Sequence, residues 1–327
     1  MPDVVTTSRQ FQDALDKANK RELQVLINEY SRMYKRLQDK IDLLILETEG
    51  KPITEGQLVR LERYKSLMRQ IENELLDFQS LVTRQTRATI DAGLIAGERD
   101  ARRLLSVTIN GDVEIAAQFN RLPSGAIKKM IAFLDDDSDL YKRIKLLAPN
   151  TFEIIRQRMI EGIGLGYNPK KIAAMIQDGF GVGLTDAMRT VRTAQIWAYR
   201  ESNRGIYNAN QDVVKGWVWC ASLDDLTCMS CVAEHGTEHP LDEPLDDHYN
   251  GRCVALPLTV FGNPIEEPGT SWFEKASEAQ QRAMMGVGKY EAWKDGKFSL
   301  DAMPSQRPVE VYGKMRFEAS LKELIGE

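Results

Sequence analysis

The fold is decided by the segment of residues 23–44, whose sequence is LQVLINEYSRMYKRLQDKIDLL. Its apolar residues recur in alternating steps of four and three, the spacing of a long helix that packs along one face against a second helix. The members of this apolar seam are Leu23, Ile27, Tyr30, Tyr34, Leu37, Ile41 and Leu44.

A second seam of the same kind follows: Leu61, Tyr64, Met68, Ile71, Leu75, Phe78 and Val82. Between the seams, Gly50 and Pro52 are residues that end a helix. Thr54 with Gln57 matches the capping box that opens the next one. We therefore predict an antiparallel helical hairpin. It is either an arm that docks on a partner or a hairpin folded against the rest of its own chain.

Several shorter helical patterns follow, separated by turn signals, and the acidic run of residues 135–137 fits a loop or helix end. The glycine-rich stretch at residues 162–166 follows a helical pattern rather than a strand. It therefore predicts a helix C-terminus and not a phosphate-binding loop. Another long helix is expected from about Asp186 to Gln211, with Thr185 as its N-cap.

This last helix has two contrasting faces. One face carries small residues that suit close helix packing: Ala187, Val191, Ala194, Ala198, Ser202, Ile206 and Ala209. The other carries Arg189, Arg192, Arg200 and Arg204, which either form a solvated face or contact nucleic acid or an acidic partner.

A Cys/His-rich module follows Gly216, beginning with the short strand pattern Trp217-Val218-Trp219. All four cysteines and all three histidines lie between residues 220 and 253. A C-x2-C pair can bring two thiolates to one Zn²⁺, and a second His/Cys pair would complete a tetrahedral shell. The predicted ligands of this structural zinc are Cys228, Cys231, His248 and Cys253, with Cys220, His235 and His239 as spare candidates. The alternatives are reduced thiols in an irregular loop and redox pairing of the C-x2-C cysteines.

Residues 235–239 also match an inverted zinc-protease signature, with His235 and His239 as ligands and Glu238 as the base. That chemistry requires a helix, and Gly236 and Pro240 disfavour one. A zinc-dependent hydrolase is thus an alternative only. The sequence contains no Walker loop and no G-x-S-x-G, so we expect no catalytic residues.

Composition narrows the function classes. The chain has 327 residues, of which 43% are hydrophobic and 28% charged, as in globular proteins. It shows no stretch apolar enough for a membrane anchor and no signal-peptide pattern at its start. Residues 217–327 hold 19 Asp/Glu against 10 Lys/Arg, whereas residues 1–107 are nearly balanced, at 17 against 18. No strongly basic DNA-binding domain is present.

The predicted architecture is mainly α-helical. It has an N-terminal antiparallel helical hairpin, a central helical domain, a small β/loop module like a zinc knuckle and a C-terminal helix at about Arg316–Leu324. The expected segments are residues 1–107, 108–215, 216–262 and 263–327.

Three stretches between about residues 150 and 300 are more specific together than alone. The first is Val191-Arg192-Thr193-Ala194 with Asn203-Arg204-Gly205. The second is Trp217-Val218-Trp219 with Asp225 to Cys231 and His235-Gly236. The third is Ser271-Trp272-Phe273 with Gln280-Gln281, Gly286 and Lys294 to Lys297. Together they resemble the phage Mu F-like minor head proteins, also called head morphogenesis proteins. The family pattern continues with H-x-x-C-R-C, and here Gly251 stands in place of its first cysteine.

The resemblance implies a minor structural protein of a tailed-phage head. Such a protein associates with the portal protein and other head proteins, acts in head morphogenesis and DNA packaging or ejection, and can meet packaged DNA. It would be found in the virion head, and in the host cytoplasm during assembly, with no small-molecule substrate. The alternative classes are the zinc-dependent hydrolase and a zinc-containing nucleic-acid-binding protein, whose DNA binding would be sensitive to salt.

Overall fold

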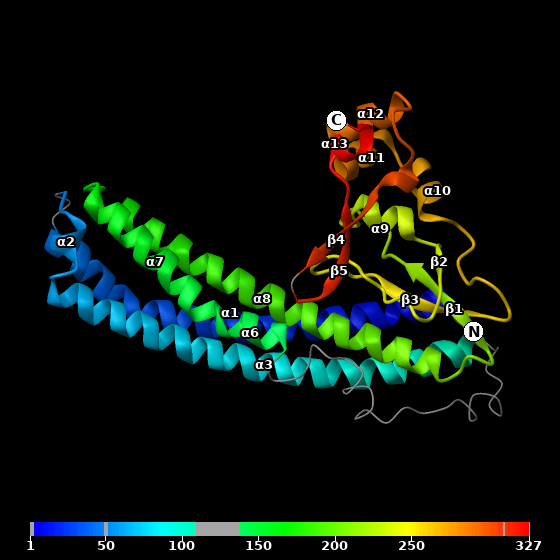
Figure 1. Ribbon diagram of the computed structural model, residues 1–327, viewed down its shortest axis with the longest axis horizontal. Helices are drawn as coiled ribbons and strands as arrows, with labels where there is room; N and C mark the ends of the chain where they lie inside the picture. Colours follow the sequence, from blue (N-terminus) through cyan, green and yellow to red (C-terminus); the bar gives the residue numbers. More distant parts are fainter. Residues whose placement is uncertain (1–2, 49–51, 109–137, 310, 327) are drawn as a thin grey trace. The chain divides into compact units, whose positions relative to one another are not determined.

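The computed structural model describes residues 3–48, 52–108, 138–309 and 311–326 (Figure 1). Within them the protein is mainly helical with a few short antiparallel strands, as predicted. The helix end expected at Gly50 and the acidic run of residues 135–137 lie outside the described residues.

The chain divides into two compact units. The Cys/His unit comprises residues 1–17, 90–133 and 195–327, and the helical unit comprises residues 18–89 and 134–194. Three long helices each contribute to both units: α1 (Val4–Thr48), α3 (Glu62–Thr108) and α8 (Pro169–Asn208). This division cuts across the four segments expected from the sequence, because the predicted hairpin supplies residues to both units.

In the helical unit, α1 and α3 run antiparallel. Arg36 of α1 pairs with Glu74 of α3 at 2.5 Å, and Glu47 of α1 pairs with Arg63 of α3 at 3.6 Å. The later residue of α1 therefore meets the earlier residue of α3, as in an antiparallel pair. The apolar seam of α3 is buried from Tyr64 to Val82, as predicted. The seam of α1 differs from the predicted one. Leu26 and Met33 are buried, whereas the predicted members Leu23, Ile27 and Tyr34 are only partly buried.

The capping box forms at the predicted residues, but it opens a different helix. Thr54 and Gln57 cap each other's backbone at the start of the short helix α2 (Glu55–Leu58). The helix α3 begins only at Glu62.

The hairpin is packed against its own chain in the helical unit. The ring of Phe180 on α8 lies 6.1 Å from Tyr30 and 5.4 Å from Tyr34, both on α1. Gln79 on α3 accepts a hydrogen bond from the backbone of Ala148 at 3.1 Å. Two more helices of this unit are α6 (Asp139–Lys145) and α7 (Leu147–Gly164).

The helix α8 is longer than predicted, and the expected N-cap at Thr185 is wrong. The hydroxyl of Thr185 donates a hydrogen bond to the carbonyl oxygen of Gly181 at 2.9 Å. Such a bond to the residue four positions earlier is made inside a helix and not at its start. The preceding glycines were expected to lie outside the helix. At Gly183, however, a Cβ atom would come within 2.4 Å of Thr151. Close packing against α7 thus requires glycine there and outweighs its low helix propensity.

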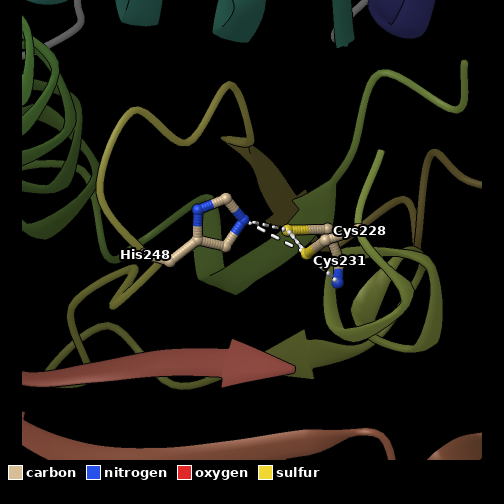
Figure 2. A group of neighbouring side chains, drawn as sticks. All are labelled: Cys228, Cys231 and His248. Atoms are coloured by element: carbon tan, nitrogen blue, oxygen red, sulfur yellow. Dashed lines mark hydrogen bonds between the residues drawn. The ribbon is translucent and has the colours of Figure 1, made fainter. Parts of the chain in front are cut away.

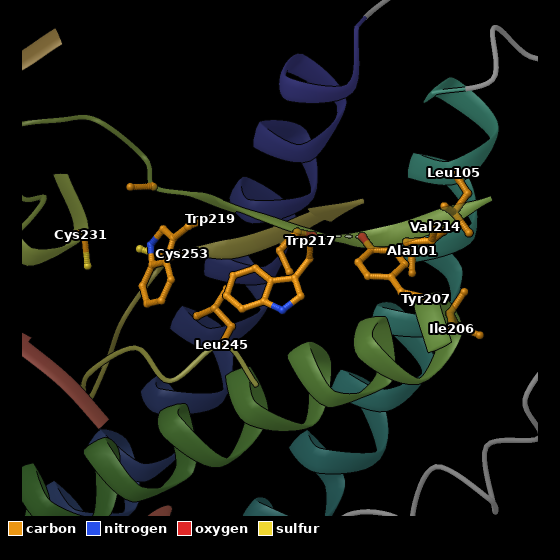
Figure 3. Close-up of a cluster of buried hydrophobic side chains, with 12 residues drawn as sticks. Ala101, Leu105, Ile206, Tyr207, Val214, Trp217, Trp219, Cys231, Leu245 and Cys253 are labelled. Atoms are coloured by element: carbon orange, nitrogen blue, oxygen red, sulfur yellow. Dashed lines mark hydrogen bonds between the residues drawn. The ribbon is translucent and has the colours of Figure 1, made fainter. Parts of the chain in front are cut away.

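The Cys/His unit contains an antiparallel sheet with the strand order β2-β1-β3. Its strands are β1 (Val214–Cys220), β2 (Glu238–His239) and β3 (Val254–Thr259). Both faces are buried. Trp217 and Trp219 pack on one side with Leu105 of α3 and Tyr207 of α8 (Figure 3), and Val218 packs in another cluster. The predicted strand at Trp217–Trp219 is confirmed.

The N-terminal end of α1 and the C-terminal end of α3, which lie far from the turn of the hairpin, are part of this core. Val4 of α1 and Leu104 of α3 belong to the same buried cluster as Val218. The helices α3 and α8 approach so closely that a Cβ at Gly97 would lie 2.4 Å from the carbonyl oxygen of Tyr199. The small-residue face of α8 is buried from Ala187 to Ile206, as its suitability for close helix packing predicted. The hairpin therefore cannot be removed without opening the core.

The C-terminal region adds short helices: α9 (Met229–Glu234), α10 (Gly269–Glu274), α11 (Glu278–Met285), α12 (Val287–Lys294) and the 3-10 helix η2 (Leu300–Ala302). It ends in the hairpin of β4 (Pro304–Val309) and β5 (Gly313–Glu318), followed by α13 (Leu321–Ile325). The last helix was predicted to begin near Arg316, which instead lies in β5. The hairpin packs against α9, and its Met315 is fully buried.

Candidate metal centre

Cys228 and Cys231 lie at the start of α9. Cys228 is the N-cap residue, and its sulfur accepts a hydrogen bond from the backbone nitrogen of Cys231 at 3.4 Å. One helical turn therefore separates the two side chains, and their Sγ atoms are 3.2 Å apart. The C-x2-C spacing thus places two sulfurs side by side, as predicted.

The loop before α9 is fixed to the segment that contains the second ligand pair. Asp224 accepts two hydrogen bonds of 2.6 Å from the guanidinium group of Arg252. It also accepts from the hydroxyl of Thr227 and from the backbone of Leu226, both at 3.0 Å. These contacts hold residues 224–227 against the loop that carries His248.

His248 completes a trio with the two cysteines (Figure 2). Its Nε2 atom lies 3.1 Å from Cys228 Sγ and 3.4 Å from Cys231 Sγ. Its Nδ1 atom lies 2.9 Å from the carbonyl oxygen of Tyr249, to which it can donate. This second bond leaves Nε2 directed at the sulfurs, an arrangement typical of metal-binding histidines.

A second trio shares Cys231 and adds Asp247 and Cys253. Asp247 is fully buried, and its Oδ1 atom lies 3.3 Å from Cys231 Sγ. Its Oδ2 atom accepts a hydrogen bond from buried Arg200 at 2.7 Å. Arg200 also donates to the carbonyl oxygen of Cys253, at 2.8 and 3.0 Å.

In the first trio, a negative charge on Cys228 and a positive charge on His248 stabilise each other. The hydrogen bond with Cys231 and the nearby His248 lower the pKa of Cys228 to about 5. Burial lowers the pKa of His248, but its contacts with Cys228 and Asp247 outweigh burial and raise it to about 9. Burial also opposes ionisation of Asp247, yet Arg200 and His248 bring the pKa of that carboxyl below its usual value. Both shifts favour a thiolate at Cys228 and a protonated imidazole at His248.

The donor set fits a metal ion. Around a tetrahedral Zn²⁺, with bonds of ~2.3 Å to sulfur and ~2.0–2.1 Å to nitrogen, neighbouring ligand atoms are roughly 3.5–3.8 Å apart. The three atoms of the first trio, at 3.1–3.4 Å, need only a small outward movement. The predicted ligands Cys228, Cys231, His248 and Cys253 thus form one cluster that could bind a metal, with Cys253 in the second trio.

The spare candidates lie elsewhere. Cys220 packs in the cluster on the other side of β1, and burial raises its pKa to about 12. His235 is buried, and its Nδ1 atom accepts a hydrogen bond from the backbone of Ala221 at 3.0 Å. His239 stacks on Trp217 with ring centroids 4.2 Å apart.

The inverted zinc-protease motif is not helical. The helix α9 ends at Glu234, and His235 is its C-cap. Glu238 and His239 lie in β2. Because the two histidines contact different partners, the structure does not bring the motif together as a ligand set.

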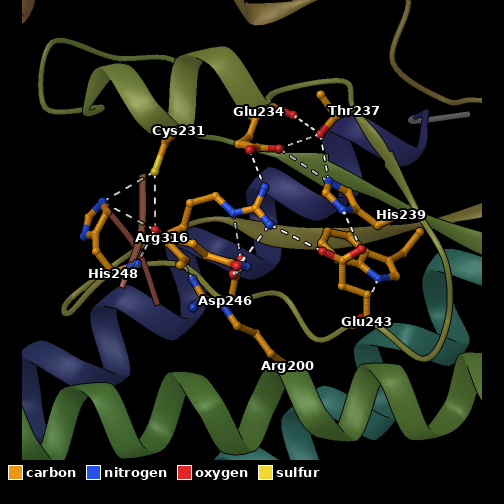
Figure 4. Close-up of polar contacts among 12 residues, drawn as sticks. Arg200, Cys231, Glu234, Thr237, His239, Glu243, Asp246, His248 and Arg316 are labelled. Carbon is orange, nitrogen blue, oxygen red and sulfur yellow. Dashed lines mark hydrogen bonds and ion pairs between the residues drawn. The ribbon is translucent and has the colours of Figure 1, made fainter. Parts of the chain in front are cut away.

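The structure also contains an ion-pair cluster that the sequence analysis missed (Figure 4). Arg316 of β5 pairs with Glu234 and, at 2.9 Å, with Asp246. Its guanidinium carbon lies 5.2 Å from the ring centroid of Trp219. This arginine fixes the C-terminal hairpin to the loop that carries Asp246 and His248. The adjacent acidic residues Asp246 and Asp247, directly before a predicted histidine ligand, were the signal that could have found both carboxylates.

The four arginines of α8 do not form one exposed face. Arg200 is 4% exposed and is held by Asp247, so it cannot contact DNA or a partner. Arg204 is partly buried and pairs with Glu201 at 2.5 Å. Arg192 is half-buried, whereas Arg189 is exposed.

Comparisons of the chain with protein-family models, with curated proteins and with solved structures found no match. Among the described helices, none combines the length and the apolar character that crossing a bilayer requires.

Proposed function

We propose that this chain is a minor structural protein of a tailed-phage head, associated with the portal protein and acting in head morphogenesis. The motifs that resemble the Mu F-like minor head proteins support this proposal. One observation carries it: the motif residues pack together although they are far apart in the sequence. Trp217, Cys231 and Cys253 share one buried cluster, and Phe273 shares another with Met229.

The proposed role of the Cys/His centre is structural. A zinc ion held by Cys228, Cys231, His248 and a fourth donor would cross-link the start of α9 to the loop before β3. Because a preformed site is absent from the unfolded chain, the free energy of zinc binding adds to the stability of the fold. The proposal assigns no catalytic step to the metal.

We place the docking surface on the helical unit. The nearly equal numbers of acidic and basic residues in residues 1–107 favour docking by shape and apolar contact over docking by charge. Leu43 and Leu46, close to the C-terminal end of α1, are 49% and 63% exposed and supply apolar surface for such a contact. Among the four α8 arginines Arg189 is the exposed one, and we assign to it a contact with packaged DNA or an acidic partner.

The test is co-purification of the full chain with the portal protein encoded by the same genome, together with its incorporation into assembled heads. Deletion of residues 1–107 is unsuitable, because Leu104 and Leu105 belong to the Cys/His core. The double variant Leu43→Glu/Leu46→Glu should instead reduce both readouts about tenfold or more, as loss of central apolar contacts does. The control is Leu226→Glu, at a site 84% exposed in the Cys/His unit. If the double variant is incorporated into heads at the wild-type level, the helical unit is not the docking element.

A further inference from the structure

The carboxylate of Asp247 has two oxygens with different surroundings. Oδ2 is held by the guanidinium group of Arg200 at 2.7 Å. Oδ1 lies 3.3 Å from Cys231 Sγ and 3.4 Å from His248 Nε2. Oδ2 is thus fixed by a buried cation. Oδ1 accepts a hydrogen bond from the backbone nitrogen of His248 at 2.8 Å and is also close to two donor atoms of the first trio.

Gly251 provides the space for this carboxylate. A Cβ atom at position 251 would lie 1.9 Å from Asp247 Oδ2 and 2.3 Å from its Cγ atom. Any side chain at this position would therefore displace the carboxylate. The backbone of Gly251 has no positive φ, so the need for glycine is one of space and not of conformation.

The formal charges favour the carboxylate of Asp247 over a thiolate of Cys253 as the fourth metal ligand. Two thiolates, Asp247 and a neutral His248 carry three negative charges, which Zn²⁺ and Arg200 together balance. If Cys253 were a thiolate ligand instead, Asp247 would remain buried beside the site, and one negative charge would lack compensation. Such a buried charge is strongly unfavourable.

We propose that Asp247, through Oδ1, is the fourth ligand of a Zn²⁺ ion bound by Cys228, Cys231 and His248, and that Cys253 is a neutral buried thiol. This inference rests on the zinc site of the proposed function. The metal replaces two protons, the thiol proton of Cys231 and the Nε2 proton of His248, and both are released to water. Arg200 then links the metal to α8 through the other oxygen, as outer-shell partners of metal ligands do.

Cobalt substitution of the full chain tests the ligand set. Thiolate-to-cobalt charge-transfer absorption grows with the number of bound thiolates, because sulfur is the soft donor. We expect the intensity of two thiolates per Co²⁺, an unchanged spectrum for Cys253→Ser, and loss of about half the intensity for Cys228→Ser. An intensity of three thiolates that falls by about one third in Cys253→Ser would overturn this inference and leave the zinc site intact. If the wild-type protein binds neither Co²⁺ nor Zn²⁺, both the assignment of Asp247 and the proposed zinc site are wrong.

A second measurement uses Gly251. Gly251→Ala should displace Asp247 and weaken Zn²⁺ binding at least ~10-fold in a competition with a chromophoric chelator. The matched control is Gly181→Ala, where an added Cβ meets no atom within 4 Å. Far-ultraviolet circular dichroism should confirm that both variants are folded. Wild-type Zn²⁺ affinity in a folded Gly251→Ala variant would refute the role of Asp247.

Discussion

Replacing His235 with asparagine should remove much of the acid sensitivity of the Cys/His unit. His235 is 5% exposed, and its Nδ1 atom must be unprotonated to accept the hydrogen bond from Ala221. Burial and the nearby charge of Arg9 lower its pKa from 6.5 to about 4, and Glu267 acts in the opposite direction. Between these two pH values the unfolded chain binds a proton that the folded chain excludes.

The direction in which pH changes the free energy of unfolding follows from this difference in proton binding. The stability that neutral His235 contributes is fully present above pH 6.5 and is lost as the pH falls towards the folded-state pKa. Proton linkage with pKa values of 6.5 and about 4 gives a loss of about 2 kcal/mol between pH 7 and pH 5. The same relation gives about 3 kcal/mol by pH 4. In His235→Asn the side-chain oxygen can accept the same hydrogen bond without titrating.

The assay is urea unfolding followed by tryptophan fluorescence at several pH values. All five tryptophans of the chain lie in residues 195–327, so the signal reports only on the unit that contains His235. The effects of acid on the carboxylates and on the Cys/His cluster are common to both proteins, so the difference between their unfolding free energies isolates His235. If that difference stays constant from pH 7 to pH 5, the reasoning is wrong.

Four further outcomes are expected. Cys228→Ser should abolish stoichiometric zinc in elemental analysis and lower the melting temperature, because metal-binding free energy is folding free energy; equal zinc in both proteins would contradict this. Gly97→Ala should destabilise the protein by ~1–3 kcal/mol in urea unfolding, because its Cβ would lie 2.4 Å from a backbone oxygen of α8. Gly181→Ala, with open space around its Cβ, should instead stabilise by ~0.5–1 kcal/mol, so similar effects of the two changes would disprove the close helix crossing. Glu238→Gln should leave stability and head incorporation unchanged, and a peptidase activity that vanishes in this variant would overturn the structural role.

The fold could be predicted wherever local pattern coincides with burial. The two long helices, the capping box at Thr54 and the strand at Trp217–Trp219 all depend on residues within a few positions of one another. Prediction failed where a distant contact decides the conformation. Gly183 is helical because it packs against Thr151, and β5 forms a hairpin that packs on α9.

The same distinction applies to the metal centre. The sequence alone determined that Cys228 and Cys231 would lie together, because C-x2-C places both sulfurs at one helix start. Only the tertiary structure decided that Arg200 is buried, since its partner Asp247 lies 47 residues further along the chain, in the loop between β2 and β3. A helical wheel gives the direction of a side chain but not the element that covers it. Burial of a charge is therefore set by the partner that folding brings to it, and no local pattern contains that partner.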